Sequence, residues 1–282
     1  MPTLYIVGTP IGNLEDITLR ALRILCEVKL IAAEDTRTTR KLLNRHAIKT
    51  KLTSFHEHNK KGKLPFILEV LKSKDVALVS EAGVPSISDP GADLVRKALE
   101  SGVTTVPIPG PSAVTTALSV SGTPANAFIF LGFPPRRKNE RLSMLATLSA
   151  ESRTTVAFEA PQRLRQTLED MLSAWGDRTI VLCRELTKVH EEIYRGTISA
   201  ALSRFTQPRG EFTLVVEGVE DTRVKIEEDW IESELVRLKA EGLRAKDVVT
   251  ALAAASGLSR RSVYQKWLDL NKDKAPSNGI LS

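Results

Sequence analysis

The sequence predicts an α/β protein with two α/β domains and a small C-terminal helical segment. Three observations support this prediction. An apolar run, a polar loop and a helix-like segment follow one another five times within residues 1–120. After residue 120 the pattern changes, because a strand runs into a Pro-Pro pair and a basic cluster. From residue 227 onward no strand pattern remains, and the apolar spacing favours helices.

The first domain, residues 1–120, is expected to hold a mainly parallel sheet with helices on its faces. Asp16 is expected to cap its first helix, whose apolar residues Ile17, Ala21 and Ile24 share one face. If all five strands are parallel, the loops that follow them gather at one edge of the sheet. These loops are residues 8–13, 34–37, 56–59, 81–89 and 109–112.

The loop after the fourth strand carries carboxylates and hydroxyls between two glycines, Gly83 and Gly91. Ligands of open α/β sheets bind outside the carboxyl ends of the strands, where backbone amides and helix amino termini collect. The polar content of this loop therefore favours a binding site. A tight strand-to-helix connection without a ligand is the alternative.

The second domain is predicted at residues 121–220, with strands near 128–133, 154–158, 179–183 and 211–216. Residues 227–270 are expected to form helices. Two of these, joined through Gly257, are typical of a helix-turn-helix, although a helical cap packed on the second domain fits the same pattern. Residues 271–282 are expected to be disordered.

Charge favours a polyanionic partner. The formal net charge is +6, and residues 37–63 carry nine basic side chains against one acid, Glu57. A second basic cluster lies at residues 136–141. A charge run is often only a solvated surface, but two such runs raise the case for nucleic acid. No apolar run is long enough for a membrane span, no secretory signal is expected, and the cytoplasm is the expected compartment.

Several common sites are disfavoured by their missing motifs. The segment after the first strand, Gly8-Thr9-Pro10-Ile11-Gly12, lacks the Gly-x-Gly-x-x-Gly dinucleotide pattern, and no phosphate-binding Gly-Lys-Ser/Thr is present. His56 and His58 lie two residues apart with no cysteine nearby, so no metal site is expected. Cys26 and Cys183 lie in apolar segments and are expected to be buried thiols.

Five loop motifs together carry a family resemblance. They are residues 8–14, 33–37, 54–59, 81–91 and 109–113, in this order along the chain. The chain resembles the tetrapyrrole methylase family, in particular its branch that methylates ribosomal RNA. The resemblance covers roughly residues 3–218 and, with the tail, most of the chain. One departure stands in the fourth motif, where Glu81 and Val84 replace the usual Asp and Thr; the missing threonine hydroxyl removes any side-chain hydrogen bond at position 84 but leaves backbone contacts possible.

The resemblance implies an S-adenosylmethionine-dependent enzyme that methylates the ribose 2′-hydroxyl of a cytidine in 16S ribosomal RNA. It further implies a homodimer that acts on 16S ribosomal RNA or the small ribosomal subunit. The cofactor-binding residues that it implies are Pro10, Ala82, Gly83, Val84, Ile87, Ser88, Ser112, Ala113, Phe158 and Thr213.

A ribose hydroxyl is a poor nucleophile, so a nearby base would assist the reaction. The candidates on the clustered loops are Glu34, Asp35, His56 and Glu81, and Arg37 is a candidate phosphate ligand. An N-cap with an internal ion pair is the structural alternative for residues 34–37. Two other functions stay open: methylation of a tetrapyrrole, which requires neither the basic runs nor the helical tail, and non-catalytic RNA binding.

Overall fold

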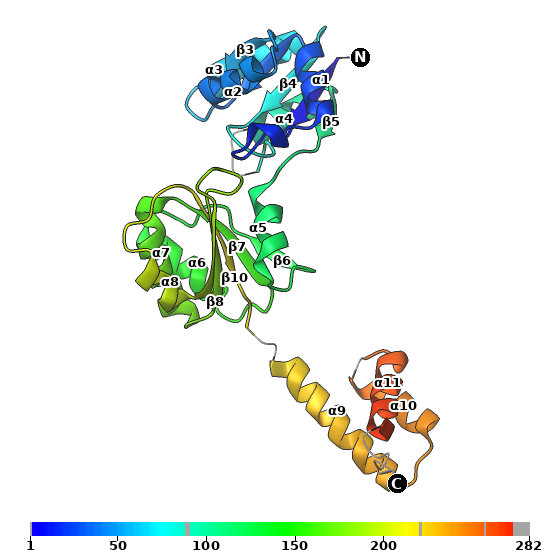
Figure 1. Ribbon diagram of the computed structural model, residues 1–282. Helices are drawn as coiled ribbons and strands as arrows, with labels where there is room; N and C mark the ends of the chain where they lie inside the picture. Colours follow the sequence, from blue (N-terminus) through cyan, green and yellow to red (C-terminus); the bar gives the residue numbers. More distant parts are fainter. Residues whose placement is uncertain (1, 88–90, 220–221, 257, 273–282) are drawn as a thin grey trace, which may run out of the picture. The chain divides into compact units, whose positions relative to one another are not determined.

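The computed structural model describes residues 2–87, 91–219, 222–256 and 258–272. It divides into two compact units, residues 1–219 and 220–282. Unit 1 contains two five-stranded sheets with helices, and unit 2 contains helices (Figure 1). The predicted α/β fold with C-terminal helices is therefore confirmed. No helix of the described residues is long and apolar enough to cross a membrane.

The first sheet is parallel throughout, with the strand order β3-β2-β4-β1-β5. Its strands are β1 (Thr3–Val7), β2 (Leu30–Ala33), β3 (Lys51–Ser54), β4 (Val76–Val79) and β5 (Thr104–Ile108). Both faces of β2 and β4 are buried, which explains their unbroken apolar sequences. The five parallel strands predicted from the sequence are confirmed, and their following loops meet at one edge.

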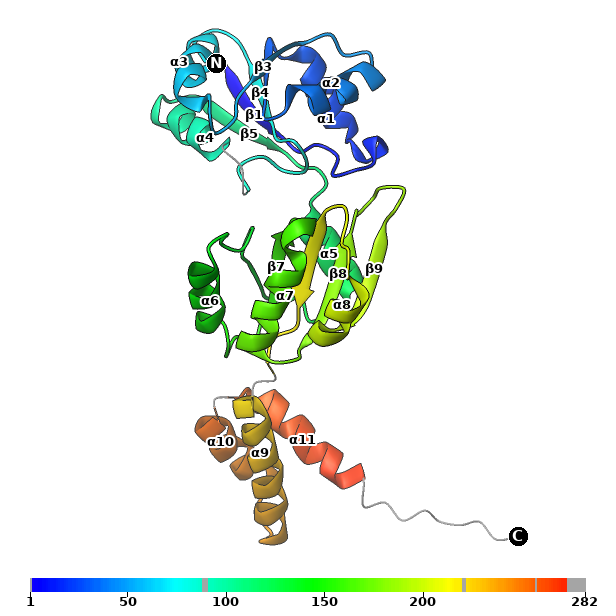
Figure 2. The ribbon, with the colours of Figure 1, turned by 90° about the vertical axis from the view of Figure 1, so that its left-hand side faces the viewer.

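Helices cover both faces of this sheet (Figure 2). Alternate strand residues face opposite sides: Ile31 and Val79 pack with α1 (Leu19–Glu27) and α2 (Thr36–Arg45). Leu30 and Leu78 pack with α3 (Lys60–Leu71) and α4 (Gly91–Glu100). The expected cap of α1 is wrong: Asp16 ends a short 3-10 helix, Leu14–Asp16, and Thr18 Oγ1 accepts the capping bond from Ala21 N at 3.1 Å.

The second sheet is mixed, with the order β6-β7-β10-β8-β9. Its strands are β6 (Phe128–Phe130), β7 (Thr154–Glu159), β8 (Thr179–Arg184), β9 (Glu192–Thr197) and β10 (Phe212–Val216). Only the β6–β7 pair is parallel. On one face lie α6 (Lys138–Thr147), α7 (Pro161–Trp175) and α8 (Ile198–Arg204), and on the other lies α5 (Ala113–Ser121) (Figure 1). Helix α5 thus carries the chain from the last loop of the first sheet onto the second.

Unit 2 is a small bundle of α9 (Thr222–Ala240), α10 (Ala245–Ser256) and α11 (Arg260–Lys272). Ile231 and Leu235 of α9 pack with Leu252 of α10 and Trp267 of α11. Ser259 Oγ accepts a bond from Ser262 N at 3.1 Å and so caps α11. The tail expected to be disordered lies, from residue 273 on, outside the described residues.

Candidate functional site

The loops after β1 and β4 are joined by a pair of backbone hydrogen bonds. Thr9 N donates to Gly83 O at 2.9 Å, and Gly83 N donates to Thr9 O at 3.1 Å. Gly83 has φ +77°, a conformation that side chains other than glycine rarely adopt. These two loops therefore form one continuous rim at the carboxyl edge of the first sheet, as expected from adjacent parallel strands.

The loop after β5 joins the same rim through a close glycine contact. Gly8 N donates to Ile108 O at 3.0 Å. A Cβ added to Gly110 would lie 2.8 Å from the backbone carbon of Gly8, and one added to Gly8 would lie 2.8 Å from Gly110 Cα. No other residue type fits at this crossing without displacing a backbone. Pro111 O also lies near Gly83, 3.5 Å from where its Cβ would stand.

The loop after β2 adds carboxylates to the rim. Glu34 N donates to Val79 O at 3.2 Å, and Glu34 Oε2 accepts from Glu81 N at 3.2 Å. The Glu34 side chain thus holds the backbone of the residue that begins the β4 loop. Glu81 itself is exposed. Two of the predicted candidate bases therefore lie together, beside the predicted cofactor residues 82–84.

Asp35 is the N-cap of α2, and its carboxylate is fully engaged. Oδ1 accepts from the backbone N–H of Arg37 at 2.7 Å and of Thr38 at 3.4 Å, while Oδ2 pairs with Arg37 Nη2 at 3.0 Å. The hydrogen bonds from the Arg37 side chain and backbone lower the pKa of Asp35 to about 2. These are the contacts of the structural alternative, an N-cap with an ion pair. The Arg37 side chain remains 88% exposed, so it can still meet an anion.

His56 follows β3, at one side edge of the sheet. Its backbone N donates to Asn59 Oδ1 at 2.9 Å, and Asn59 Nδ2 donates to Ser54 Oγ at 2.9 Å, which fixes the turn. Among the described residues, none bonds to the buried His56 Nδ1. Because β2 separates β3 from β4, His56 stands farther from the Thr9–Gly83 bridge than Glu34 does.

The second sheet supplies an apolar wall. Ile11 of the β1 loop, Ala113 of α5 and Phe158 of β7 pack against one cluster that also contains Val114 and Val215. The ring of Phe158 lies 5.0 Å from that of Phe130 and 5.5 Å from that of Phe133.

Thr213 stands directly opposite Phe158 in the β7–β10 register and is 5% exposed. The first loop is also bonded to the connection between β8 and β9, because Asn13 N donates to Thr187 Oγ1 at 3.0 Å.

The structure thus brings most of the sequence-predicted residues to the rim or to the apolar wall beside it. Pro10 is buried and Ala82 exposed, Val84 and Ser112 are half-buried, and Ile87 is 49% exposed. Ser88 lies outside the described residues. Three contributors were not predicted from the sequence: Thr9, Ile11 and Gly110. All three lie within the Gly- and Pro-rich loop motifs, but their roles depend on contacts between loops, which the sequence alone does not show.

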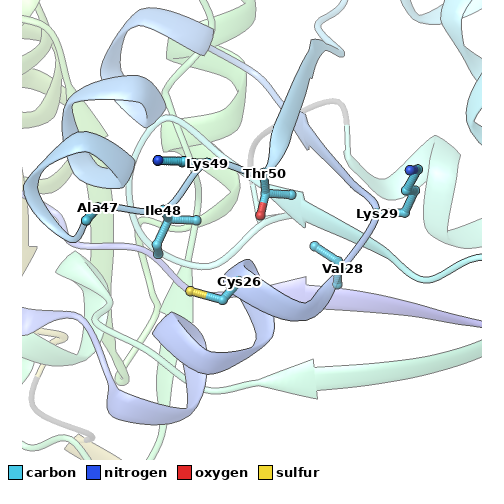
Figure 3. A pocket seen from close by; sticks show the side chains of 7 residues that line it. All are labelled: Cys26, Val28, Lys29, Ala47, Ile48, Lys49 and Thr50. Atoms are coloured by element: carbon cyan, nitrogen blue, oxygen red, sulfur yellow. The ribbon is translucent and has the colours of Figure 1, made fainter.

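A hollow of about 420 Å³ lies away from this rim (Figure 3). Its lining comes from the end of α1 and from the connection between α2 and β3, and consists of Cys26, Val28, Lys29, Ala47, Ile48, Lys49 and Thr50. These residues precede β2 and β3, so the hollow opens at the amino edge of the sheet. It contains none of the candidate site residues. Within the described part of the chain, no cluster of three or more His, Cys, Asp or Glu side chains is placed to hold a metal ion.

Comparison with known proteins assigns the family. The model of the tetrapyrrole (corrin/porphyrin) methylases matches residues 3–202. The chain belongs to the tetrapyrrole methylase family. This confirms the resemblance carried by the five loop motifs, all of which lie inside the matched range.

Relatives within this family align over most of the chain. A ribosomal RNA small subunit methyltransferase I of Halalkalibacterium halodurans is 46% identical over 93% of this chain and 93% of its own length. The protein of that name from Bacillus subtilis is 45% identical over 95% of this chain and 94% of its own. The one from Thermotoga maritima is 52% identical over 78% of this chain and 100% of its own, so it lacks a counterpart for the remainder of this chain.

Solved structures confirm the tetrapyrrole methylase fold. A cobalt precorrin-4 methyltransferase superposes with a TM-score of 0.59 at 17% identity, covering 76% of this chain and 94% of that one. A uroporphyrin-III-C-methyltransferase from Thermus thermophilus gives 0.56 at 19% identity, covering 77% and 94%. At such identities the likeness concerns the fold alone.

The chain is therefore an S-adenosylmethionine-dependent methyltransferase. The rim fits such a cofactor. Gly83, without a side chain, allows close approach to the backbone, and Ile11, Ala113 and Phe158 form an apolar wall that suits a ligand with an apolar skeleton. Glu34, bonded through Oε2 to Glu81 N, adds negative charge to the same rim, which suits a cationic group such as a sulfonium.

Proposed function

We propose that this enzyme methylates the ribose 2′-hydroxyl of a cytidine in 16S ribosomal RNA, acting in the cytoplasm on the RNA or on the small ribosomal subunit. The observation that carries this proposal is the pairing of the cofactor rim with a basic surface on the same edge of the sheet. Arg37 is exposed beside Glu34 and Glu81, and Lys61 and Lys63 follow the β3 loop. The names of relatives at 45–46% identity support an RNA acceptor.

The basic surface suits a phosphate backbone better than a tetrapyrrole. Phosphate contacts from Lys and Arg position a nucleic acid without reading its sequence. A tetrapyrrole carries carboxylates on a compact ring and requires no extended basic edge. Arg37 is proposed as a phosphate ligand because its side chain remains 88% exposed although two of its nitrogens, Nε and Nη2, donate to Asp35.

We further propose that Glu81 accepts the hydroxyl proton and that Glu34 positions it. The cofactor supplies an electrophilic methyl group, and in-line geometry between methyl and oxygen provides much of the acceleration. Glu81 adjoins the cofactor loop and is exposed, and its backbone N–H is held by Glu34 Oε2. Asp35 suits this role poorly, since a carboxylate with a pKa of about 2 is a weak base at neutral pH.

A matched pair of variants tests the two roles. Glu81→Gln is expected to lower kcat by about 10²- to 10⁴-fold, because the amide cannot accept the hydroxyl proton. Glu34→Gln keeps an oxygen that can accept from Glu81 N–H, so its loss of kcat is expected to be smaller. A kcat of Glu81→Gln equal to that of the wild type, or a larger loss in Glu34→Gln than in Glu81→Gln, would contradict the assignment.

The acceptor class is tested by methyl transfer from labelled S-adenosylmethionine. The purified protein is given small ribosomal subunits that lack this modification, the 16S ribosomal RNA extracted from them, or uroporphyrinogen. Label in the RNA and none in the porphyrin is the expected result. Label in the porphyrin alone would refute the RNA proposal while leaving the methyltransferase family intact, and cofactor binding without transfer to any acceptor would also count against it.

A homodimer is part of the same proposal, on the resemblance to the family. One chain has a mass of 31.0 kDa, and sedimentation of the purified protein is expected to give twice that mass. A sedimentation mass equal to that of one chain at assay concentrations would contradict the homodimer.

A further inference from the structure

A second hollow of about 540 Å³ opens beside the β3 loop, on the same edge of the sheet as the cofactor rim. It is lined by His58, Asn59, Gly62, Lys63 and Phe66. Its size lies within the range of about 300–1,000 Å³ typical of small-ligand sites. Unlike the hollow at the amino edge, it contains aromatic and imidazole rings.

Phe66 gives this hollow an exposed aromatic face. It is a large apolar side chain on helix α3, yet it is 44% exposed, while its neighbour Ile67 is fully buried in the core. Lys63 Nζ lies 6.0 Å from the centre of the Phe66 ring. A Cβ added to Gly62 would meet nothing within 4 Å, so the space beside the ring is open. The hollow therefore offers an aromatic face with a cation beside it.

The charges around the hollow favour an anionic ligand. Lys60 is neutralised by Asp93 at 2.6 Å and by Glu57 at 2.8 Å, which ties the start of α3 to α4. Within the described part of the chain, neither Lys61 nor Lys63 has a carboxylate within ion-pairing distance. These two cations can therefore bind phosphates beside the exposed Phe66 ring.

A second ring pair links the hollow to the end of strand β3. The ring of His58, which lines the hollow, lies 6.0 Å from that of His56 in an edge-to-face arrangement. Strand β3 lies two strands away from β4 in the sheet order, which corresponds to about 10 Å across the sheet. That separation suits a nucleotide next to the methylated one rather than the methylated nucleotide itself.

We propose that this hollow holds an unpaired base of the RNA substrate, stacked on Phe66, with Lys61 and Lys63 contacting the adjacent phosphates. Proteins recognise single-stranded RNA by splaying bases onto aromatic side chains beside basic residues. The inference rests on the proposed RNA methylation and adds a subsite for a flanking nucleotide to it.

The test uses three variants of the full chain. Phe66→Ala removes the stacking face, and Phe66→Trp enlarges it. Leu99→Ala is the matched control, because Leu99 is also an exposed apolar helix residue, 57% exposed against 44% for Phe66, and lies near the end of α4 at the amino edge of the sheet. Each variant is assayed for methyl transfer to unmodified small ribosomal subunits, for S-adenosylmethionine binding by calorimetry, and for oligomeric state by sedimentation.

Phe66→Ala is expected to raise the KM for subunits by about 5- to 150-fold, the range measured for loss of one stacked base. Its S-adenosylmethionine affinity is expected to equal that of the wild type. Phe66→Trp and Leu99→Ala are expected to keep the KM within about threefold of the wild-type value. Phe66→Trp retains an aromatic ring for stacking, and Leu99 takes no part in stacking. In Phe66→Trp, addition of a short single-stranded RNA is expected to quench a fluorescence component that the wild type lacks.

Three results would overturn the subsite. The first is an unchanged KM in Phe66→Ala while the wild type methylates subunits, which also separates this failure from failure of the RNA proposal itself. The second is an equal rise in KM for Phe66→Ala and Phe66→Trp, which would indicate mere disturbance of α3. The third is dissociation of a dimer by Phe66→Ala with transfer per active site unchanged, which would make the hollow an interface between copies of the chain.

Discussion

The β1 and β5 loops cross at Gly8 and Gly110 with no room for a side chain, and Gly110→Ala tests whether the cofactor site depends on this crossing. The new methyl group would lie 2.8 Å from the backbone carbon and 2.9 Å from the Cα and carbonyl oxygen of Gly8. Backbone atoms cannot swing aside as a flexible side chain would, so the β1 and β5 loops must move apart. Overpacking of this kind costs about 1–3 kcal/mol of unfolding free energy.

The effect on function is expected to exceed the effect on stability. For a unit of this size, that cost lowers the melting temperature by about 2–12 °C. The β1 loop also carries the Thr9–Gly83 bridge, so its displacement shifts the β4 loop at the same time. The dissociation constant for S-adenosylmethionine is therefore expected to rise at least tenfold, which corresponds to about 1.4 kcal/mol of lost binding.

Calorimetry and thermal unfolding measure these two effects on the same samples. Gly62→Ala is the control, because a Cβ there meets nothing within 4 Å and α3 gains a better helix former. That variant is expected to be more stable by about 0.5–1 kcal/mol with unchanged cofactor affinity. Wild-type affinity in Gly110→Ala would refute the rim as the cofactor site.

Four further predictions concern separate parts of the chain. Asp170→Ala is expected to lower the unfolding free energy by about 3–5 kcal/mol in denaturant titration, since it leaves the fully buried Arg141, now paired at 2.6 Å, without its counter-ion; a loss below about 1 kcal/mol would contradict this. The stabilising contribution of Asp35 is present above its unfolded pKa of 3.8 and lost as the pH falls toward its folded pKa of about 2. Asp35→Asn is therefore expected to flatten the stability curve between these pH values, and an unchanged acid limb would exclude the assigned contacts. Arg37→Ala is expected to raise the KM for subunits more than the dissociation constant of the cofactor, and equal losses would remove its phosphate role. Truncation after Val219 is expected to leave cofactor binding intact, because the first compact unit ends there and contains every candidate cofactor residue. Loss of cofactor binding on truncation would contradict that independence. The effect of the truncation on the KM for subunits reports whether the helical unit contributes to RNA affinity.

The sequence predicts the first sheet well because its strands are buried on both faces. Apolar runs such as residues 76–79 are typical of a central parallel strand buried on both faces, and the Gly- and Pro-rich loops mark their ends. Strand β9, Glu192–Thr197, escaped prediction because it is a half-buried edge strand with Glu192 and Arg195 in it. Its place depends on pairing with β8 and not on its own apolar pattern.

The sequence predicts which loops and residues form the candidate site, but not the contacts that join those loops. Gathering of the loops follows from parallel strands, and the family motifs name the residues. The Thr9–Gly83 bridge and the Gly8–Gly110 contact join segments more than 70 residues apart, so no local pattern contains them. The bond from Glu81 N to Glu34 Oε2 joins residues 47 apart and likewise lies outside any local pattern; it identifies Glu34 as a support for the Glu81 backbone.

Nucleoside analysis of labelled small subunits tests the central claim most directly. Unmodified subunits are methylated with labelled S-adenosylmethionine, and the 16S ribosomal RNA is digested and resolved by mass spectrometry. The account predicts that the label resides in 2′-O-methylcytidine and that the linkage following it resists alkaline hydrolysis. Label on a base, or subunits that remain unlabelled while the enzyme binds its cofactor, would contradict it.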